Sequence, residues 1–447
     1  MLGDTVSVVR PRTYEEAAAA VRDCGARGAV ARGGPGRPHG DAARNAGGAV
    51  LDMAGLDRVH VVDADEGIVL CGAGVPLHRL ARLLPSLGWS VPVAPVGGRV
   101  TVGGAIGADL HGGNHPVAGS FSRHVLSLEV LTADGEVHAV KPGTELFAAT
   151  AGGMGLTGVI LTATVRLLAV ETAYLTVDTE RATDLDDLLA RMTAARARQR
   201  YRTARIDLTA RGAATGRAVL TRADHTPLGA LRPGTRAWRH PLSPLPRRLP
   251  SASALLPGGL PVELPDGPLG RTAAGLLGEF RHRATPRARV GELRPLAAAF
   301  PSPATVPHKP GGPGRAGRVR HRFAVGPGQE ETLHRIVRRL AAHRCASAHA
   351  ILQPLGDADP GWLSFAVPGW ALALDLPAAF PGLDGLLDQI DEEVAAAGGR
   401  VCLADGSPLR PDLLPVMYPR VADFRALRAR LDPRGVFASD LARRLDL

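Results

Sequence analysis

The pattern of apolar and polar positions divides the first 170 residues into many short strands and a few helices. The segment from Thr13 to Glu16 has the form of a capping box and predicts a helix that runs to about Gly25. Leucines recur with helical spacing between Pro76 and Leu87 and predict a second helix. Strands are predicted at Ala29–Arg32, Ala49–Met53, Val59–Val62, Gly67–Cys71, Val125–Thr132, Glu136–Val140 and Val159–Leu168, with a hairpin at Asp134-Gly135. This part of the chain is therefore predicted to be α+β.

The composition changes after about residue 175. Residues 239–270 and 300–318 are rich in proline, glycine and arginine, and we predict mobile loops there because neither run can bury much surface. Helix and strand patterns resume around these runs, at Val319–Val325, Glu330–His343, Ala350–Gln353, Trp362–Phe365, Ala371–Leu374 and Leu383–Ala397. A second unit is therefore expected to follow the first.

Length and cysteine usage narrow the class of protein. A chain of 447 residues is too long for one small core, so two domains are expected. No apolar run reaches the roughly 18 residues that a membrane-spanning helix needs, and the first residues lack the regions of a signal peptide. The four cysteines are far apart and form no CxxC pair, so neither a disulfide framework nor a metal site is expected. These features favour the cytoplasm.

The chain is basic, with 53 lysines and arginines against 43 acidic residues and a net charge of +10. Only Lys141 and Lys309 are lysines. This bias is typical of a GC-rich genome, and the alternative is an anionic partner, either a phosphorylated substrate or a membrane surface that binds the protein weakly. Nucleic acid is not expected as a partner, because aromatic residues make up only 4% of the chain and do not interleave with a basic stretch.

The segment from Val100 to Asn114 concentrates glycines and also contains His111. Glycine lets bare backbone N–H groups approach a phosphate, and a nearby histidine can take part in chemistry. With this segment, the chain has three glycine-rich loops, at 33–40, 97–107 and 152–158. Together they suit a long cofactor held by backbone groups, although each loop alone is equally compatible with an ordinary tight turn.

Residues Gly153 to Gly158 match the GxGxxG pattern of dinucleotide-binding folds. That fingerprint requires a strand before it and a helix after it, so that the helix N-terminus meets the pyrophosphate. Here a predicted helix at Glu145–Thr150 precedes the glycines and a β-rich run follows them. We therefore do not interpret the match as a Rossmann site.

Several motifs together resemble a flavoprotein family. They are Ala31-Arg-Gly33, Gly36-Arg-Pro-His-Gly-Asp41, Val100-Thr-Val-Gly-Gly-Ala-Ile106, Ala118-Gly-Ser-Phe121, Leu131-Thr-Ala-Asp-Gly-Glu136, Gly155-Leu-Thr-Gly158, Pro368-Gly-Trp370, Met417-Tyr-Pro-Arg-Val421 and the run from Val436 to Leu445. Residues 1–175 resemble the FAD-binding domain of the vanillyl-alcohol-oxidase/p-cresol-methylhydroxylase (PCMH) superfamily. More narrowly, nearly the whole chain is similar to the actinobacterial decaprenylphosphoryl-β-D-ribose 2′-oxidase family, with residues 200–318 aligning poorly.

The resemblance implies an FAD domain built from both ends of the chain, residues 1–175 and 399–447. The segment 176–398 is then an inserted α+β substrate domain with an antiparallel sheet and flanking helices. The implied activity is oxidation of a sugar hydroxyl to a ketone by hydride transfer to flavin N5, with the protein supplying orientation and electrostatics. In the family a reductase then reduces the ketone to the epimer, so a short-chain reductase is an implied partner.

The resemblance also implies which residues contact the cofactor. They are Arg32, Gly33, Gly36, Arg37, Pro38, His39, Gly40, Thr101, Val102, Gly103, Gly104, Ala108, His111, Gly155, Gly158, Ile160 and Cys402. Related flavoproteins often attach FAD to a histidine in the first glycine loop, but this family has an arginine there, matched by Arg37. FAD is therefore expected to bind non-covalently. His39 stands where the family has tyrosine, so a covalent link through His39 is the alternative.

On the substrate side the chain departs from the family pattern. Asp405 occupies the position of a family lysine, and a carboxylate cannot donate hydrogen bonds as an ammonium does, although it can act as a base. Gln353 and Gly113 align with two further lysines, Cys402 with a tyrosine, Ala371 and Ala373 with an asparagine and a cysteine, and Arg320 and Arg322 with two glutamines. Substrate contacts are expected from Asn114, Arg320, Arg322, Gln353 and Trp370. Lys309 lies in a predicted loop and is not expected to compensate.

The catalytic candidates are His111 and Asp405. His111 is retained from the family site and is expected to accept the hydroxyl proton, with a structural role in the glycine loop as the alternative; His115 is expected to be structural. The leading hypothesis is an FAD-dependent oxidase or dehydrogenase acting on a secondary hydroxyl of a sugar, polyol or glycosyl substrate, to which the family's lipid-linked substrate need not apply. The alternative is a catalytically degenerate FAD-binding paralogue that serves as a partner or regulatory subunit.

Overall fold

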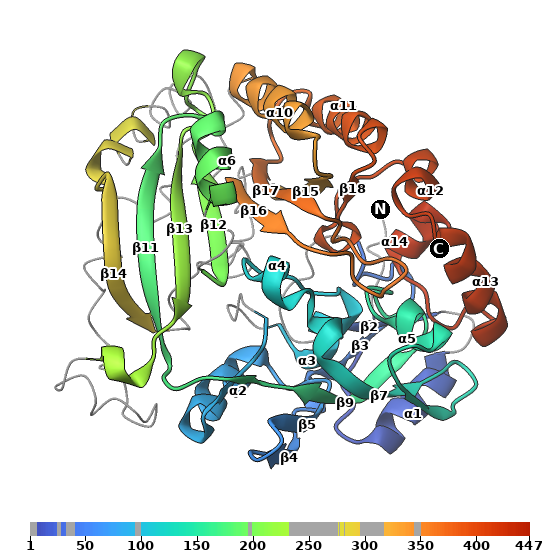
Figure 1. The fold of residues 1–447 in the computed structure, drawn as a ribbon. Coiled ribbons are helices and arrows are strands. Elements are labelled where there is room, and N and C mark those ends of the chain that lie inside the picture. The colour runs from blue at the N-terminus through green and yellow to red at the C-terminus, as the bar shows by residue number, and fades with distance from the viewer. Residues whose placement is uncertain are drawn as a thin grey trace.

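The computed structural model describes residues 7–24, 28–32, 41–93, 100–194, 199–231, 276, 278–280, 282–295, 317–343 and 350–447. The loop predicted at 239–270, most of the one predicted at 300–318 and the first glycine loop at 33–40 lie outside these residues. In the described part of the chain the strands form four sheets, and the two larger ones carry the architecture (Figure 1).

A five-stranded antiparallel sheet forms the centre of the first unit, with the order β4-β5-β9-β7-β8. Its strands are β4 (Val59–Asp63), β5 (Ile68–Gly72), β7 (Val125–Leu131), β8 (Val137–Val140) and β9 (Val159–Arg166). The predicted hairpin is confirmed, because β7 and β8 pair antiparallel around Gly135. A small parallel sheet of β1 (Ser7–Val9), β3 (Ala49–Asp52) and β2 (Ala29–Arg32) packs against helix α1 (Tyr14–Cys24).

The second unit is an eight-stranded sheet in which every neighbouring pair is antiparallel. Its strands follow the order β14 (Ala288–Pro295), β11 (Tyr174–Ala182), β13 (Ala218–His225), β12 (Tyr201–Ile206), β16 (Ala350–Leu355), β17 (Gly369–Pro377), β15 (Arg318–Val325) and β18 (Arg400–Val401). Helices α6 (Leu185–Ala194), α10 (Glu330–Ala342) and α11 (Leu383–Ala396) cover one face (Figure 1). The prediction of an α+β fold with an antiparallel sheet and flanking helices is therefore confirmed.

The two faces of the larger sheet differ in chemistry because side chains alternate along each strand. On β15, Phe323 and Val325 pack into one core with the three covering helices. Arg318, Arg320 and Arg322 occupy the intervening positions, so they belong to the opposite face. The arginines of β15 are thereby kept out of the helix-covered core and lie on the face that meets the first unit.

The C-terminal segment returns to the first unit and braces it. Ala29 donates its N–H to Val436 O at 2.7 Å and accepts from Ala438 N at 2.8 Å, so the segment pairs with the start of β2. Helix α14 (Asp440–Leu445) then holds residue 41 through an ion pair of 2.7 Å between Arg444 and Asp41. Figure 1 shows these C-terminal helices, in red, beside elements from the N-terminal half.

Some local predictions differ from the structure. Residue 318, placed at the end of a mobile loop, is the first residue of β15 because it pairs with Pro377. Trp362–Phe365 forms no regular element, since Trp362 N donates to Ala148 O and Ser364 N donates to Gly361 O instead of to a neighbouring strand. The division at 175 and 398 stays a prediction, although β18 still pairs with β15 past residue 398. None of the helices in the described ranges is long and apolar enough to cross a membrane.

Candidate functional site

Helix α3 (Val102–Gly107) occupies the second glycine loop and begins at Thr101, whose Oγ1 accepts from Gly104 N at 3.2 Å. The next amides are also used inside the protein: Val102 N donates to Val75 O at 2.9 Å and Gly103 N to Ala73 O at 2.8 Å. These three N–H groups are therefore not available to a phosphate, which differs from the expectation that bare amides converge there. The loop instead offers the surface of a short glycine-rich helix.

Three glycines, which we call the glycine cradle, leave an open surface on the first unit: Gly104, Gly107 and Gly155. A Cβ added to Gly104 would meet only Thr101 Oγ1 at 3.3 Å outside its own helix, and one added to Gly107 only Gly155 N at 4.0 Å, among the described residues. Gly104 and Gly107 lie three residues apart and so share one side of the helix. Gly103 differs, because its Cβ would lie 2.8 Å from Ala73 Cβ, so it is needed for packing.

The glycine cradle joins the second and third glycine loops to the strand that leads into the first. Met154 N donates to Gly107 O at 2.8 Å, and a Cβ on Gly155 would lie 3.6 Å from Ala31 at the end of β2. The next residue, Arg32, contacts Asp52 at 3.4 Å through Nη2, and within the described residues its buried Nε has no hydrogen-bond partner. An orphaned cationic donor beside open backbone fits the negatively charged pyrophosphate of a dinucleotide cofactor.

The other predicted cofactor residues lie in different settings. Gly158, with a φ of 151°, lets β9 approach β7, because its Cβ would lie 2.6 Å from Leu131 O. Ile160 is nearly buried in β9, and Ala108 is the half-buried residue that ends α3. Gly33, Gly36, Arg37, Pro38, His39 and Gly40, like Lys309, lie outside the described residues.

Three polar side chains, those of His111, Arg322 and Asp405, lie close together, and we call them the Arg322 cluster. His111 follows Gly107, the last residue of α3, by four residues. Arg322 Nη1 lies 3.1 Å from His111 Nε2, and Arg322 Nε forms an ion pair of 2.9 Å with Asp405 Oδ2. The three residues come from the loop after α3, from β15 and from a 3-10 turn, so the cluster spans both units. The structure thus brings together both predicted catalytic residues and one predicted substrate residue.

Burial and neighbouring charges determine the protonation of His111 and Arg322. Burial above all, with a further effect of the Arg322 charge, holds the pKa of His111 well below its usual range. Because an arginine only donates, the neutral imidazole accepts at Nε2 and carries its proton on Nδ1. Burial works against the charge on Arg322, but the Asp405 carboxylate outweighs it and raises the pKa of the guanidinium.

Apolar groups enclose the Arg322 cluster. The ring of Phe365 stacks on His111, with centroids 5.1 Å apart and an angle of 29° between the planes. Cys402 donates its backbone N–H to Arg322 O at 2.8 Å, and burial raises the pKa of its thiol to about 12. Cys402 is therefore a neutral, buried neighbour of the cluster and not a nucleophile.

The other predicted substrate residues do not lie together, and those on the larger sheet are divided between its two faces. Arg320 and Gln353 belong to the face that carries Arg322, and Arg320 Nε lies 3.9 Å from Asp375. Trp370 lies on the helix-covered face, where its Nε1 donates to Glu330 Oε1 at 3.2 Å and its ring joins the main core. Asn114 is fully buried and donates to Pro92 O at 2.8 Å. Trp370 and Asn114 are thus placed as structural residues.

A buried acidic network beside the site had no local signal in the sequence. His115 Nε2 lies 2.8 Å from Asp359, and Gly356 N donates to His115 Nδ1 at 2.9 Å, so the imidazole joins helix α4 (His115–Ala118) to the loop after β16. Asp109, with a φ of 41°, accepts from Ser120, Ser122 and Ser364. Burial and the nearby Asp359 raise the pKa of Asp109. Asp109 and Asp359 lie 250 residues apart, so only the fold reveals their proximity.

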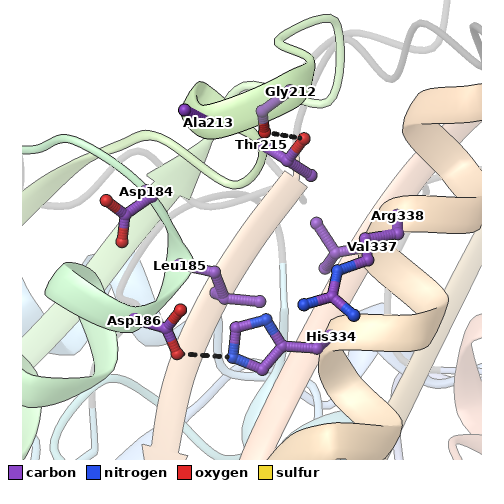
Figure 2. Close-up of a pocket in the computed structure, with 9 residues that line it drawn as sticks. All are labelled: Asp184, Leu185, Asp186, Gly212, Ala213, Thr215, His334, Val337 and Arg338. Carbon is purple, nitrogen blue, oxygen red and sulfur yellow. Dashed lines mark hydrogen bonds and ion pairs between the residues drawn. The ribbon is translucent and has the colours of Figure 1, made fainter.

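A cavity of about 330 Å³ lies between α6 and α10 and shares no residue with the Arg322 cluster (Figure 2). His334 of α10 faces Asp186 of α6 across it, with 3.0 Å between Nε2 and Oδ1. Its lining contains no group of three or more potential metal ligands among the described residues. It therefore remains a polar cleft between two helices.

Comparisons with known proteins agree with this geometry. Residues 6–141 match the model of an FAD binding domain. Over 457 aligned positions the chain is 34% identical to the decaprenylphosphoryl-beta-D-ribose oxidase of Mycolicibacterium smegmatis, covering 100% of this chain and 95% of the relative. The chain belongs to this oxidase family.

Two other relatives match shorter parts of this chain. An uncharacterised protein from the mprA 5′ region of Streptomyces coelicolor is 56% identical over 374 residues, which are 83% of this chain and all of the relative. A D-lactate dehydrogenase of Archaeoglobus fulgidus is 32% identical over 169 residues, 36% of this chain and 38% of that protein. As a member of the decaprenylphosphoryl-ribose oxidase family, the protein is an FAD-dependent oxidoreductase, and the glycine cradle and Arg32 fit its cofactor.

Proposed function

We propose that the protein oxidises a secondary hydroxyl of a sugar, polyol or glycosyl substrate to a ketone. The carrying observation is the neutral His111, buried behind Phe365 and four residues beyond the glycine cradle. The full-length similarity to an oxidase named for a ribose derivative supports the same reaction class. FAD, when bound, accepts the hydride that leaves the carbon.

The chain's own residues then have distinct tasks. His111 accepts the proton of the substrate hydroxyl, because a neutral imidazole nitrogen is a suitable general base. Asp405 was a second candidate for the base, but its ion pair with Arg322 favours the carboxylate as a counter-charge. Arg320 and Gln353 flank Arg322 on the same sheet face and supply polar contacts to the rest of the substrate.

The finer parts of the proposal follow from this chemistry. A ketone can be reduced again from its other face, so the protein can serve as the oxidising half of an epimerisation with a short-chain reductase as partner. FAD is proposed to bind without a covalent link. Acid precipitation should release the flavin into the supernatant, whereas flavin retained in the pellet would point to a bond through a residue such as His39.

Anaerobic reduction tests the function directly. The purified protein should show a flavin spectrum, and one member of a panel of pentoses, pentitols and glycosides should bleach it. His111→Ala should slow the bleaching and leave FAD bound. Flavin that dithionite reduces but no member of the panel does would instead favour a degenerate FAD-binding paralogue. Unchanged bleaching by the variant would remove His111 from the reaction.

A further inference from the structure

We infer that Arg322 is the cationic donor to the reacting oxygen, and that Asp405 is the positioning residue that holds it. The inference rests on the proposed function, because it names the group that faces His111 during oxidation. In the family pattern a lysine stands at 405 and a glutamine at 322, whereas this chain has a carboxylate and a guanidinium. The site therefore keeps a positive charge, but residue 322 carries it in place of residue 405.

The contacts of Arg322 place its charge next to the imidazole. A guanidinium has five N–H donors in a fixed plane. Among the described residues, Nε and Nη2 face Asp405 at 2.9 and 3.5 Å, and one N–H of Nη1 points to His111 Nε2 at 3.1 Å. The second N–H groups of Nη1 and Nη2 are left for a ligand. The side chain of Arg322 keeps 16% of its surface exposed, so an incoming group can reach it.

A hydroxyl group suits both side chains when it replaces their direct contact, for which Arg322 Nη1 and His111 Nε2 must separate from 3.1 Å. Its oxygen can accept from Arg322 Nη1 while its own O–H donates to His111 Nε2, so one hydroxyl satisfies both partners of the present contact. In the reaction the O–H bond breaks and its proton passes to Nε2. The C–H electron pair leaves as hydride to oxidised flavin, and the carbonyl forms. Arg322 stabilises the negative charge that develops on the oxygen, which is how preorganised donors lower such barriers.

Asp405 is suited to positioning because its segment is fastened to β15 on both sides of Asp405, at Cys402 and at Ser407. Cys402 N donates to Arg322 O at 2.8 Å, and Ser407 Oγ lies 2.6 Å from Nδ1 of His321. Nε2 of His321 in turn lies 3.2 Å from Asp391 of α11. With only 10% of its side chain exposed, Asp405 is held against the guanidinium. Its negative charge also offsets the repulsion between Arg322 and a protonated His111.

The rate of flavin reduction in matched variants tests the roles of Arg322 and Asp405. Arg322→Gln should retain FAD and slow reduction by about 100-fold, the usual effect of removing one oxyanion donor. Asp405→Asn should slow it by about 10-fold, and Arg322→Lys should recover part of the rate. The double variant Arg322→Gln with Asp405→Lys restores the family pair and should react at least about 10-fold faster than Arg322→Gln alone. Arg318→Gln, four residues away on the same strand, is the control and should react at the wild-type rate.

A histidine titration provides a readout that is independent of turnover. In FAD-loaded protein without substrate, NMR of labelled histidines, assigned with His111→Gln, should show His111 neutral with its proton on Nδ1. Arg322→Gln should raise the pKa of His111, because the Arg322 charge is one of the causes that lower it. An unchanged titration, a wild-type reduction rate in Arg322→Gln, or a double variant no faster than Arg322→Gln would each overturn the inference. Failure of every candidate to reduce the wild-type flavin would instead reject the proposed function and leave the titration as the test of Arg322.

Discussion

The glycine cradle and the Arg322 cluster lie four residues apart in the chain, from Gly107 to His111, but they are built in opposite ways. The cradle uses positions where side chains are missing, and its shape comes from backbone. The cluster uses three side chains from segments 211 and 83 residues apart, and its cation has a counter-charge. Side chains near a backbone surface can be substituted without altering that surface. In a charged cluster, the substitution of one charged residue requires a matching substitution of its partner. The cofactor site can therefore persist while the substrate side is rebuilt.

The largest expected effect comes from adding a side chain to the glycine cradle. Among the described residues, Gly107→Leu fills a space in which only Gly155 N lies within 4 Å of a Cβ, so the protein should fold while FAD affinity falls by about 100-fold. Fluorescence titration of FAD into the apoprotein measures this. Gly385→Leu is the matched control, because Gly385 is also a helical glycine and no described residue outside its helix lies within 4 Å of its Cβ. Equal FAD affinity in both variants would show that the cradle does not receive the cofactor.

A smaller effect concerns the pH dependence of stability in the larger sheet, compared with cofactor binding at the cradle. Burial above all lowers the pKa of His225, at the end of β13, to about 4, against about 6.5 in the unfolded chain. The unfolded state therefore binds the proton first, so the stabilising contribution is full above pH 6.5 and is lost as the pH falls towards 4. By pH 4.5 the loss should be about 2 kcal/mol.

Urea unfolding of wild type and His225→Gln at pH 7 and pH 4.5 measures this loss. The variant should lose less stability than the wild type over the same interval, and parallel losses would contradict the assignment. The affinity for FAD should not change with pH in the same way, because the backbone amides that would hold it do not titrate in this range.

The smallest expected effect concerns Gly113, which the sequence resemblance aligns with a lysine of the family. A Cβ there would lie 2.7 Å from Thr203 Cγ2 and 3.2 Å from Arg202 O of β12, so Gly113→Ala should cost about 1 kcal/mol of stability. Thr203→Ser removes the methyl group, and a double-mutant cycle should show that it recovers most of this loss. A purely additive cycle would mean that β12 does not close this position.

The hairpin at Gly135 could be predicted from the sequence because its turn joins strands that are neighbours in the chain. The helix that begins at Thr101 was not predicted, and its first bond occupies the Gly104 amide that was expected to be free. Resemblance also pointed to His111, Arg322 and Asp405. The ion pair between Arg322 and Asp405 was missed, although the exchange of a lysine for an acid and a glutamine for an arginine is a complementary signal.

Other residues required the fold. Trp370 was expected to bind substrate, but strand alternation turns its ring into the core below α10, where Glu330 accepts its N–H. Asp359 comes from a stretch without regular structure, so no periodicity marks it, and Phe365 was expected in a regular element that does not form. Their place beside His115 and His111 depends on how the two units meet.

The bracing of β2 by the C-terminal segment has a consequence for the order of events during synthesis. The first glycine loop follows β2 and rejoins the described chain at Asp41, and residues beyond 435 hold both the start of β2 and Asp41. A nascent chain still on the ribosome has made the cradle and the larger sheet long before it has made these contacts. We therefore expect FAD to be captured only after the last helix has been released and docked. A nascent-chain complex stalled before residue 430 should be unable to retain the cofactor.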